Sequence, residues 1–102
     1  MNEIIKERIN LIAEICKKYK VKNLYAFGSV CSERFNEKSD IDLLVNFDKN
    51  ISIEEYTDNY FLLTYELQNL FLRKVELITE NSLSNPYFIN SLEKNKIAVY
   101  EG

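Results

Sequence analysis

The chain has 102 residues and a net charge of −3, with 46% hydrophobic residues and no histidine. This length and apolar content favour one globular domain over residues 1–102 and exclude a disordered chain. The lack of histidine excludes serine–histidine triads and most zinc sites, and the acidic balance argues against long nucleic acids as partners. No apolar run approaches the roughly 18 residues of a membrane span and no signal-like segment opens the chain, so we expect a cytoplasmic protein without a membrane partner.

The first predicted element is a helix over residues 3–20. Its apolar side chains recur every three or four residues, at Ile5, Ile9, Ile12, Cys16 and Tyr19. Lysines crowd the end of this helix, where they either interact with the helix dipole or bind phosphate or RNA. Neither Cys16 nor Cys31 has the spacing of a metal-ligand pair, so we expect reduced thiols.

Two apolar runs then predict two buried strands, over residues 23–28 and 40–47. Between them, Gly28 and Ser29 form a predicted turn, and the charged stretch 29–38 predicts a short helical turn and an exposed loop. A glycine lets the backbone approach a ligand closely, and free N–H groups at a helix start can hold phosphate. We therefore expect Gly28 and Ser29 to contact a phosphorylated ligand.

Asp40 and Asp42 lie at the start of the second strand with one residue between them. Side chains alternate along a strand, so both point to the same face, about 6–7 Å apart at Cα. Two carboxylates on one face repel each other and lose solvation unless a cation lies between them. Their oxygens suit Mg²⁺, which completes its shell with water and substrate phosphates. An EF-hand loop starting at Asp40 is excluded, because its sixth and twelfth positions would be Val45 and Ile51.

A long helix is predicted to start near residue 53. Ser52 and Glu55 form a capping box, and Ile51 and Tyr56 are placed to form a hydrophobic staple. The helix carries an apolar stripe at Tyr56, Tyr60, Leu63, Leu67 and Leu70, and four more apolar residues widen it: Phe61, Leu62, Phe71 and Leu72. So wide a face is either a deep core with some exposed aromatics or a surface for a partner or a second copy.

The last part of the chain predicts a strand, a helix and a strand. The strand Lys74–Thr79 carries Glu76 in an apolar setting, with Lys74 on the same face. Asn85 and Pro86 predict the start of the last helix, as its cap and first residue. Residues 97–100 predict a final short strand. The expected fold is therefore α/β, a small mixed β-sheet flanked by helices, in a single domain.

The spacing of Gly28 and Ser29, ten residues, then Asp40-x-Asp42, with an apolar run on each side, resembles the signature of the DNA polymerase β nucleotidyltransferase superfamily. The short length and the closing segment resemble the minimal nucleotidyltransferases, which are known as antitoxin partners of HEPN-domain toxins. The resemblance covers about residues 25–100. Glu76 matches the third acid of the family, which lies in a strand after the long helix.

The resemblance implies a Mg²⁺-dependent enzyme that transfers AMP from ATP to a hydroxyl group, with a tyrosine of a HEPN toxin as acceptor. Asp40, Asp42 and Glu76 would hold two Mg²⁺ ions, and Glu76 is also a candidate base. Gly28 and Ser29 would hold the outer phosphates. The partner would bring the acceptor, since the transferases of this superfamily that modify RNA or antibiotics carry extra domains for it.

One position departs from the family pattern. Members often carry Arg-Gly shortly after the Gly-Ser pair, where this chain has Ser32 and Glu33. Arg34 and Lys38 are the nearby cations that could grip the triphosphate instead. Two other functions remain open: a non-catalytic antitoxin that neutralises a partner through the wide face of the 53–72 helix, and an RNA-modifying enzyme that acts with a partner.

Overall fold

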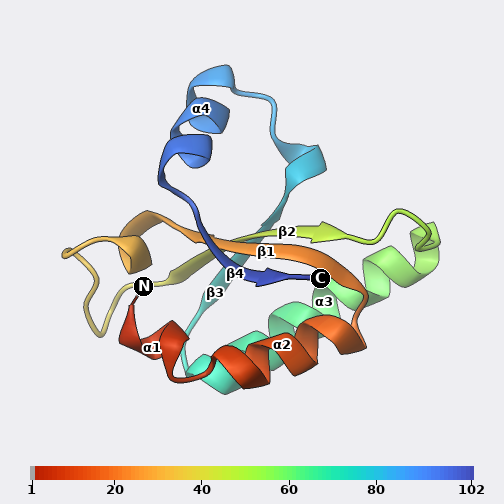
Figure 1. Ribbon diagram of the computed structural model, residues 1–102, viewed down its shortest axis with the longest axis horizontal. Helices are drawn as coiled ribbons and strands as arrows, with labels where there is room; N and C mark the ends of the chain where they lie inside the picture. The colour runs from red at the N-terminus through yellow and green to blue at the C-terminus, as the bar shows by residue number, and fades with distance from the viewer. Residues whose placement is uncertain (1) are drawn as a thin grey trace.

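The computed structural model describes residues 2–102, which form a four-stranded mixed sheet with helices on both faces (Figure 1). The strands are β1 (Val21–Phe27), β2 (Ile41–Phe47), β3 (Val75–Thr79) and β4 (Ile97–Glu101), in the order β3-β2-β1-β4. The central pair β1 and β2 is antiparallel, β3 is parallel to β2, and β4 is antiparallel to β1. The predicted α/β class, a small mixed sheet flanked by helices, is confirmed.

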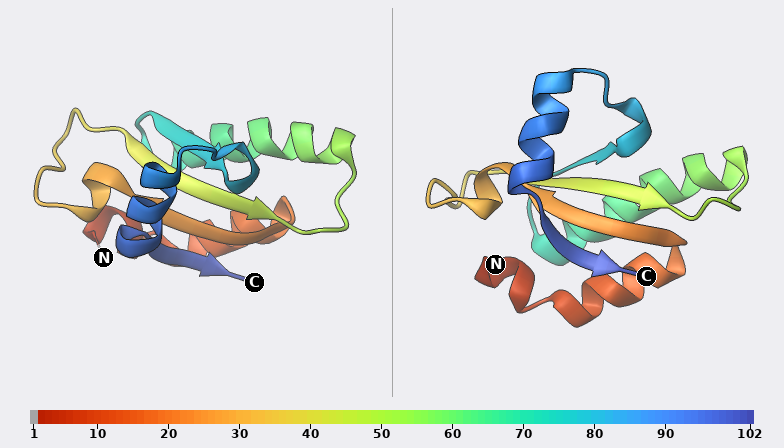
Figure 2. Two further views of the ribbon diagram at one scale, coloured as in Figure 1. Left: turned by 90° about the horizontal axis from the view of Figure 1, so that it is seen from above. Right: turned by 45° about the horizontal axis from the view of Figure 1, so that its top comes forward.

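Three helices cover one face of the sheet and one helix stands over the other face (Figure 2). The covering helices are α1 (Glu3–Lys6), α2 (Ile9–Lys18) and α3 (Ile53–Phe71), and the opposite helix is α4 (Pro86–Asn95). Two short 3-10 helices, η1 (Gly28–Cys31) and η2 (Glu80–Ser82), follow β1 and β3. Within residues 2–102, none of the helices combines the length and the apolar character that a membrane crossing needs.

The main core lies between the sheet and helices α2 and α3. Alternate residues of β2 enter it, and Ile41, Leu43 and Val45 are at most 1% exposed. Because side chains alternate along a strand, Asp42 and Leu44 point to the opposite face, where α4 stands. Leu44 is buried there outside the main core, and Asp42 lies on the same face of β2.

The prediction of one helix over residues 3–20 is wrong, because the helix is broken between α1 and α2. The guanidinium of Arg8 donates to the carbonyl of Ile4 at 3.0 Å and to the carbonyl of Leu70, in α3, at 3.3 Å. Arg8 therefore satisfies orphan carbonyls near the ends of two helices. Ile5 in α1 and Ile12 in α2 both reach the core, where each is 1% exposed.

The start of α3 is confirmed, since the hydroxyl of Ser52 accepts a hydrogen bond from the backbone N–H of Glu55 at 3.1 Å. The wide apolar face of α3 is only partly buried. Phe71 joins the core, whereas Phe61 and Leu62 are 66% and 48% exposed. Part of the face is therefore core and part is free surface.

The remaining predicted strands start and end within two residues of their expected bounds, and the last helix starts at Pro86, as predicted. The side chain of Asn85 caps α4, accepting from the backbone N–H of Tyr87. Both cysteines are free thiols, as expected. Burial raises the pKa of the Cys16 thiol to about 12, which makes it inert.

Candidate active site

The strand register brings the predicted acids together. The parallel pairing of β2 and β3 sets Asp42 opposite Glu76, and the antiparallel pairing of β1 and β2 sets Phe27 opposite Asp42. Asp40 lies directly before β2, and Gly28 directly follows β1. The end of β1 and the starts of β2 and β3 therefore meet at one edge of the sheet, and four of the residues predicted from sequence lie there.

Gly28 is required at this edge for two reasons. Its φ is +71°, in the left-handed region that favours glycine. In addition, a Cβ atom at this position would collide with the Oδ2 atom of Asp42. The backbone after β1 thus lies directly against an acid of the site. The neighbouring hydroxyl of Ser29 lies 3.5 Å from the carbonyl oxygen of Asp40, so the Gly-Ser turn and the Asp-x-Asp pair are in contact.

The electrostatics show that the acids converge. The pKa of Asp42 is raised to about 6, first by burial, then by the charge of Glu76 and a hydrogen bond with it, and last by the charge of Asp40. Burial and nearby like charges both favour the protonated form of a carboxyl, which accounts for the direction of this shift. Asp42 forms no ion pair with any residue in 2–102, so its charge is left without a partner.

One lysine lies between the other two acids. The ammonium of Lys74 is 3.9 Å from Oδ2 of Asp40 and 3.9 Å from Oε1 of Glu76. Strand alternation places Lys74 on the face of Glu76, but its approach to Asp40 depends on the pairing of β2 with β3, which sequence reasoning did not include. The site therefore has three acids and one bridging cation.

These groups fit a magnesium ion by their chemistry. The three carboxylates offer oxygen ligands only, which Mg²⁺ prefers, and the pKa of Asp42 is raised first by burial and then by the two neighbouring acids. As they stand, no three Asp, Glu or Cys side chains among residues 2–102 already surround one point as metal ligands. The carboxylates of Asp40 and Glu76 instead face the Lys74 ammonium.

The two predicted cations Arg34 and Lys38 are not brought to the acids. Both lie in the exposed loop after η1, and the recorded contacts of both are backbone contacts within that loop. Instead, Arg73 holds the end of the loop, donating to the carbonyls of Asn36 and Ser39, each at 3.0 Å. This long-range contact fixes the backbone directly before Asp40 and had no signal in the sequence.

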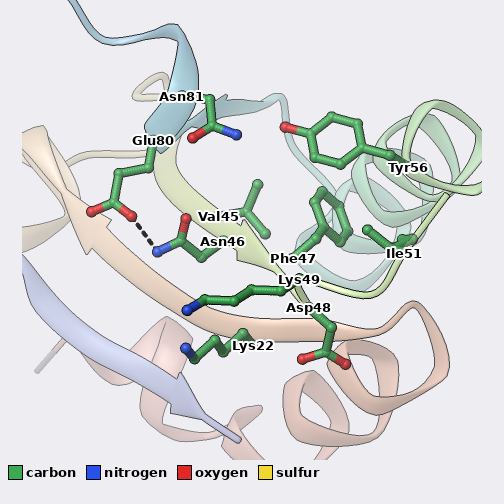
Figure 3. A pocket seen from close by; sticks show the side chains of 10 residues that line it. All are labelled: Lys22, Val45, Asn46, Phe47, Asp48, Lys49, Ile51, Tyr56, Glu80 and Asn81. Atoms are coloured by element: carbon green, nitrogen blue, oxygen red, sulfur yellow. Dashed lines mark hydrogen bonds between the residues drawn. The ribbon is translucent and has the colours of Figure 1, made fainter. Parts of the chain in front are cut away.

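Pockets lie near both ends of β2. One, of about 390 Å³, is formed between the Gly28 turn and α4, where Phe27 and Phe88 pack edge to face. The other, of about 420 Å³, lies at the far end of β2, and none of the three acids lines it (Figure 3). There Asn46 donates a hydrogen bond to Glu80, and Lys22 and Lys49 also line the pocket.

The comparison with protein families decides the class of this site. Residues 8–99 match the family described as "Nucleotidyltransferase domain". The chain belongs to this family. Two relatives from Methanocaldococcus jannaschii are named as candidate protein adenylyltransferases. One is 42% identical over 98 residues, covering 93% of this chain and 94% of the relative. The other is 37% identical over 101 residues, covering 97% and 94%. The chain is therefore a nucleotidyltransferase.

Solved structures confirm the fold of this nucleotidyltransferase. A structure titled as a minimal nucleotidyltransferase superposes with a TM-score of 0.73 at 24% identity, covering 95% of each chain. A toxin–antitoxin complex with AMP-PNP gives a TM-score of 0.70 at 19% identity, covering 92% of this chain and 73% of that one. A complex of a tri-AMPylated HEPN toxin with its MNT antitoxin from Shewanella oneidensis gives 0.65 at 17% identity, covering 96% and 73%. The predicted resemblance to minimal nucleotidyltransferases is thus confirmed at the level of the fold.

Proposed function

We propose that this nucleotidyltransferase transfers AMP from ATP to a tyrosine hydroxyl of a HEPN-type toxin and so acts as its antitoxin. The observation that carries the proposal is the register that sets Asp42 opposite Glu76, with Asp40 and Gly28 at the same edge. The likeness to candidate protein adenylyltransferases and to the toxin–antitoxin complexes supports the donor and the partner.

Each site residue has a role in this proposal. Asp40, Asp42 and Glu76 would hold two Mg²⁺ ions, which would supply positive charge to the triphosphate and to the acceptor hydroxyl. Gly28 allows the triphosphate to approach the backbone, because no side chain projects from it toward Asp42. Ser29 offers its N–H, and its hydroxyl at the edge of the site, to the outer phosphates.

The transfer itself is an in-line displacement at phosphorus. The acceptor oxygen forms a bond to the α-phosphorus, the bond from that phosphorus to the bridging oxygen breaks, and pyrophosphate leaves with the bond electrons. The hydroxyl proton passes to the carboxylate of Glu76. The side chain of Glu76 is 57% exposed, so an acceptor brought by a partner can reach it.

The acceptor hydroxyl is expected to belong to a separate protein that binds to this one. Four strands and their flanking helices account for the described chain, with no additional element that could present an acceptor. The exposed side chains Phe61, Leu62 and Tyr65 on α3 offer an apolar surface for a hetero-oligomer or a homodimer. We also propose that residues 1–102 act as one domain in the cytoplasm, whose reducing conditions suit the two free thiols.

The test is AMP transfer to a purified HEPN toxin, followed with ATP labelled at the α-phosphate and by mass spectrometry of the toxin. Wild type should label a toxin tyrosine in a Mg²⁺-dependent manner. Asp42→Asn should abolish labelling, and Asp48→Asn is the matched control, because it makes the same change at the exposed far end of β2. If Asp42→Asn still silences the toxin fully, the catalytic proposal is wrong and the protein is a binding module.

A further inference from the structure

The site contains a charge that the proposed function has not used. A triphosphate needs a cation to hold it, yet Ser32 and Glu33 stand where the family often has Arg-Gly, and the structure records no contact of Arg34 or Lys38 with the acids. The cation that does reach the acids is Lys74, which lies 3.9 Å from both Asp40 and Glu76.

We propose that Lys74 exchanges partners during the reaction: it neutralises Asp40 and Glu76 before Mg²⁺ binds, and it holds the triphosphate afterwards. This inference rests on the proposed function, since it assigns a residue to the nucleotide site. A lysine suits the task, because its ammonium is a compact charge on a flexible stem with three donors. The Lys74 side chain is 64% exposed and therefore free to move.

The exchange follows from the geometry of the acids. A divalent ion and the Lys74 ammonium compete for the same two carboxylates, Asp40 and Glu76. Once the ion has neutralised these acids, the attraction that holds the ammonium is lost. The nearest new negative charge is the triphosphate, which lies at the same edge of the sheet as Gly28. Lys74 thus suppresses binding of the ion alone and favours binding of the ion together with the nucleotide.

Arg73 and Lys96 do not suit this role, because both already bind other groups of the chain. The guanidinium of Arg73 donates to two loop carbonyls and lies 4.6 Å above the ring of Phe35. Lys96 pairs with Glu93 at 3.1 Å and lies over the ring of Tyr25. Among the residues that the structure describes, Lys74 is the cation paired with acids of the site.

The test measures two dissociation constants for Lys74→Met, with opposite expected shifts. The first is for MgCl₂ alone, by NMR titration. The second is for α,β-methylene ATP with saturating Mg²⁺, an analogue whose α–β bridge cannot be cleaved. Removing the competing charge should tighten Mg²⁺ binding by about threefold to tenfold, and removing the phosphate contact should weaken analogue binding by about tenfold. Lys74→Arg, which keeps the charge, should stay within about threefold of wild type for both.

Lys17→Met is the matched control, because Lys17 is an exposed lysine in the last turn of α2, away from the acids, and should change neither constant. Circular dichroism confirms that each variant is folded. If Lys74→Met leaves either constant unchanged, or shifts both in one direction, the proposal is overturned while the nucleotide site stands. If wild type binds neither Mg²⁺ nor the analogue, the proposed function fails and this inference fails with it.

Discussion

The two ends of β2 carry similar polar groups but differ in how their charges are satisfied. At the far end, Asn46 donates a hydrogen bond to Glu80, and nearby Lys20 pairs with Glu55 at 2.6 Å. At the near end, Asp40, Asp42 and Glu76 share one lysine, which stays 3.9 Å from two of them and does not pair with the third.

The difference shows which end is built for a ligand. At the far end, Asn46 and Glu80 satisfy each other, as do Lys20 and Glu55, so these groups need nothing from outside the chain. At the near end Asp42 pairs with no cation among residues 2–102, and its pKa is raised to about 6, first by burial and then by the neighbouring acids Glu76 and Asp40. Perturbed acids that converge in this way are typical of functional sites, because a bound cation later restores the balance. Substitutions at either end of β2 should therefore have different effects.

The largest effect is expected from Gly28→Ala. The new Cβ would collide with Oδ2 of Asp42, and alanine disfavours a φ of +71°. We expect a loss of about 2–3 kcal/mol in the free energy of unfolding and loss of nucleotide binding. Urea denaturation checks the first and titration with α,β-methylene ATP the second.

The control for this prediction is the same change in an Asp42→Ala background. There the collision with the carboxylate is absent and only the backbone strain remains, so Gly28→Ala should cost about 1 kcal/mol. Equal costs in both backgrounds would mean that Gly28 does not lie against the acid as the structure describes.

The second-largest effect is expected in the free energy of unfolding of the ion-free protein, which should depend on pH. The pKa of Asp42 rises from 3.8 to about 6 on folding, so the folded state binds the proton more tightly than the unfolded state. Its stabilising contribution is present below pH 3.8 and is lost as the pH rises through about 6. At pH 7 the ionised carboxylate therefore destabilises the fold, by about 1–2 kcal/mol after discounting for solvent screening.

Asp42→Asn should consequently stabilise the ion-free protein at pH 7 by about 1–2 kcal/mol, and the gain should shrink toward pH 4. Chemical denaturation with EDTA at both pH values measures it. Asp48→Asn, an exposed change at the other end of β2, should alter the free energy of unfolding by less than about 0.5 kcal/mol. A gain for Asp42→Asn that is equal at both pH values would contradict the convergence of the acids.

The sequence predicted those parts of this site that depend on short-range rules. Alternation along a strand places Asp40 and Asp42 on one face, and the cap at Ser52 fixes the start of α3. The parts it missed depend on contacts between distant segments. Lys74 reaches Asp40 through the parallel register of β2 and β3, and Arg73 reaches the loop before Asp40 across 34 and 37 residues.

The same reason explains the error in the first helix. The pattern of apolar residues in 3–20 fits one continuous helix, since both α1 and α2 place apolar side chains in the core. At the break, Arg8 donates to the carbonyl of Leu70, 62 residues away. A contact of this kind leaves no trace in local periodicity, so only the assembled fold reveals it.

A smaller effect is expected at the far end of β2. Asn46→Ala removes the hydrogen bond to Glu80 and should lower the free energy of unfolding by about 0.5–1.5 kcal/mol. AMP transfer should not change, because Asn46 lies away from the acids. Glu80→Gln retains an acceptor and should cost less than Asn46→Ala. Loss of transfer in Asn46→Ala would show that the two ends are coupled.

The smallest effect concerns the ion pair between Lys20 and Glu55, whose side chains are 53% and 38% exposed. Exposed pairs typically contribute about 0.2–1 kcal/mol and are screened by salt. A double-mutant cycle of Lys20→Met and Glu55→Gln should therefore give a coupling energy in this range that disappears in about 1 M salt.

The Lys74 pairs lie farther apart, at 3.9 Å, and should contribute less still to folding. A stabilising coupling for Lys74 with Asp40 larger than that for Lys20 would mean that Lys74 is a fixed structural partner, and the contrast between the two ends of β2 would then not hold.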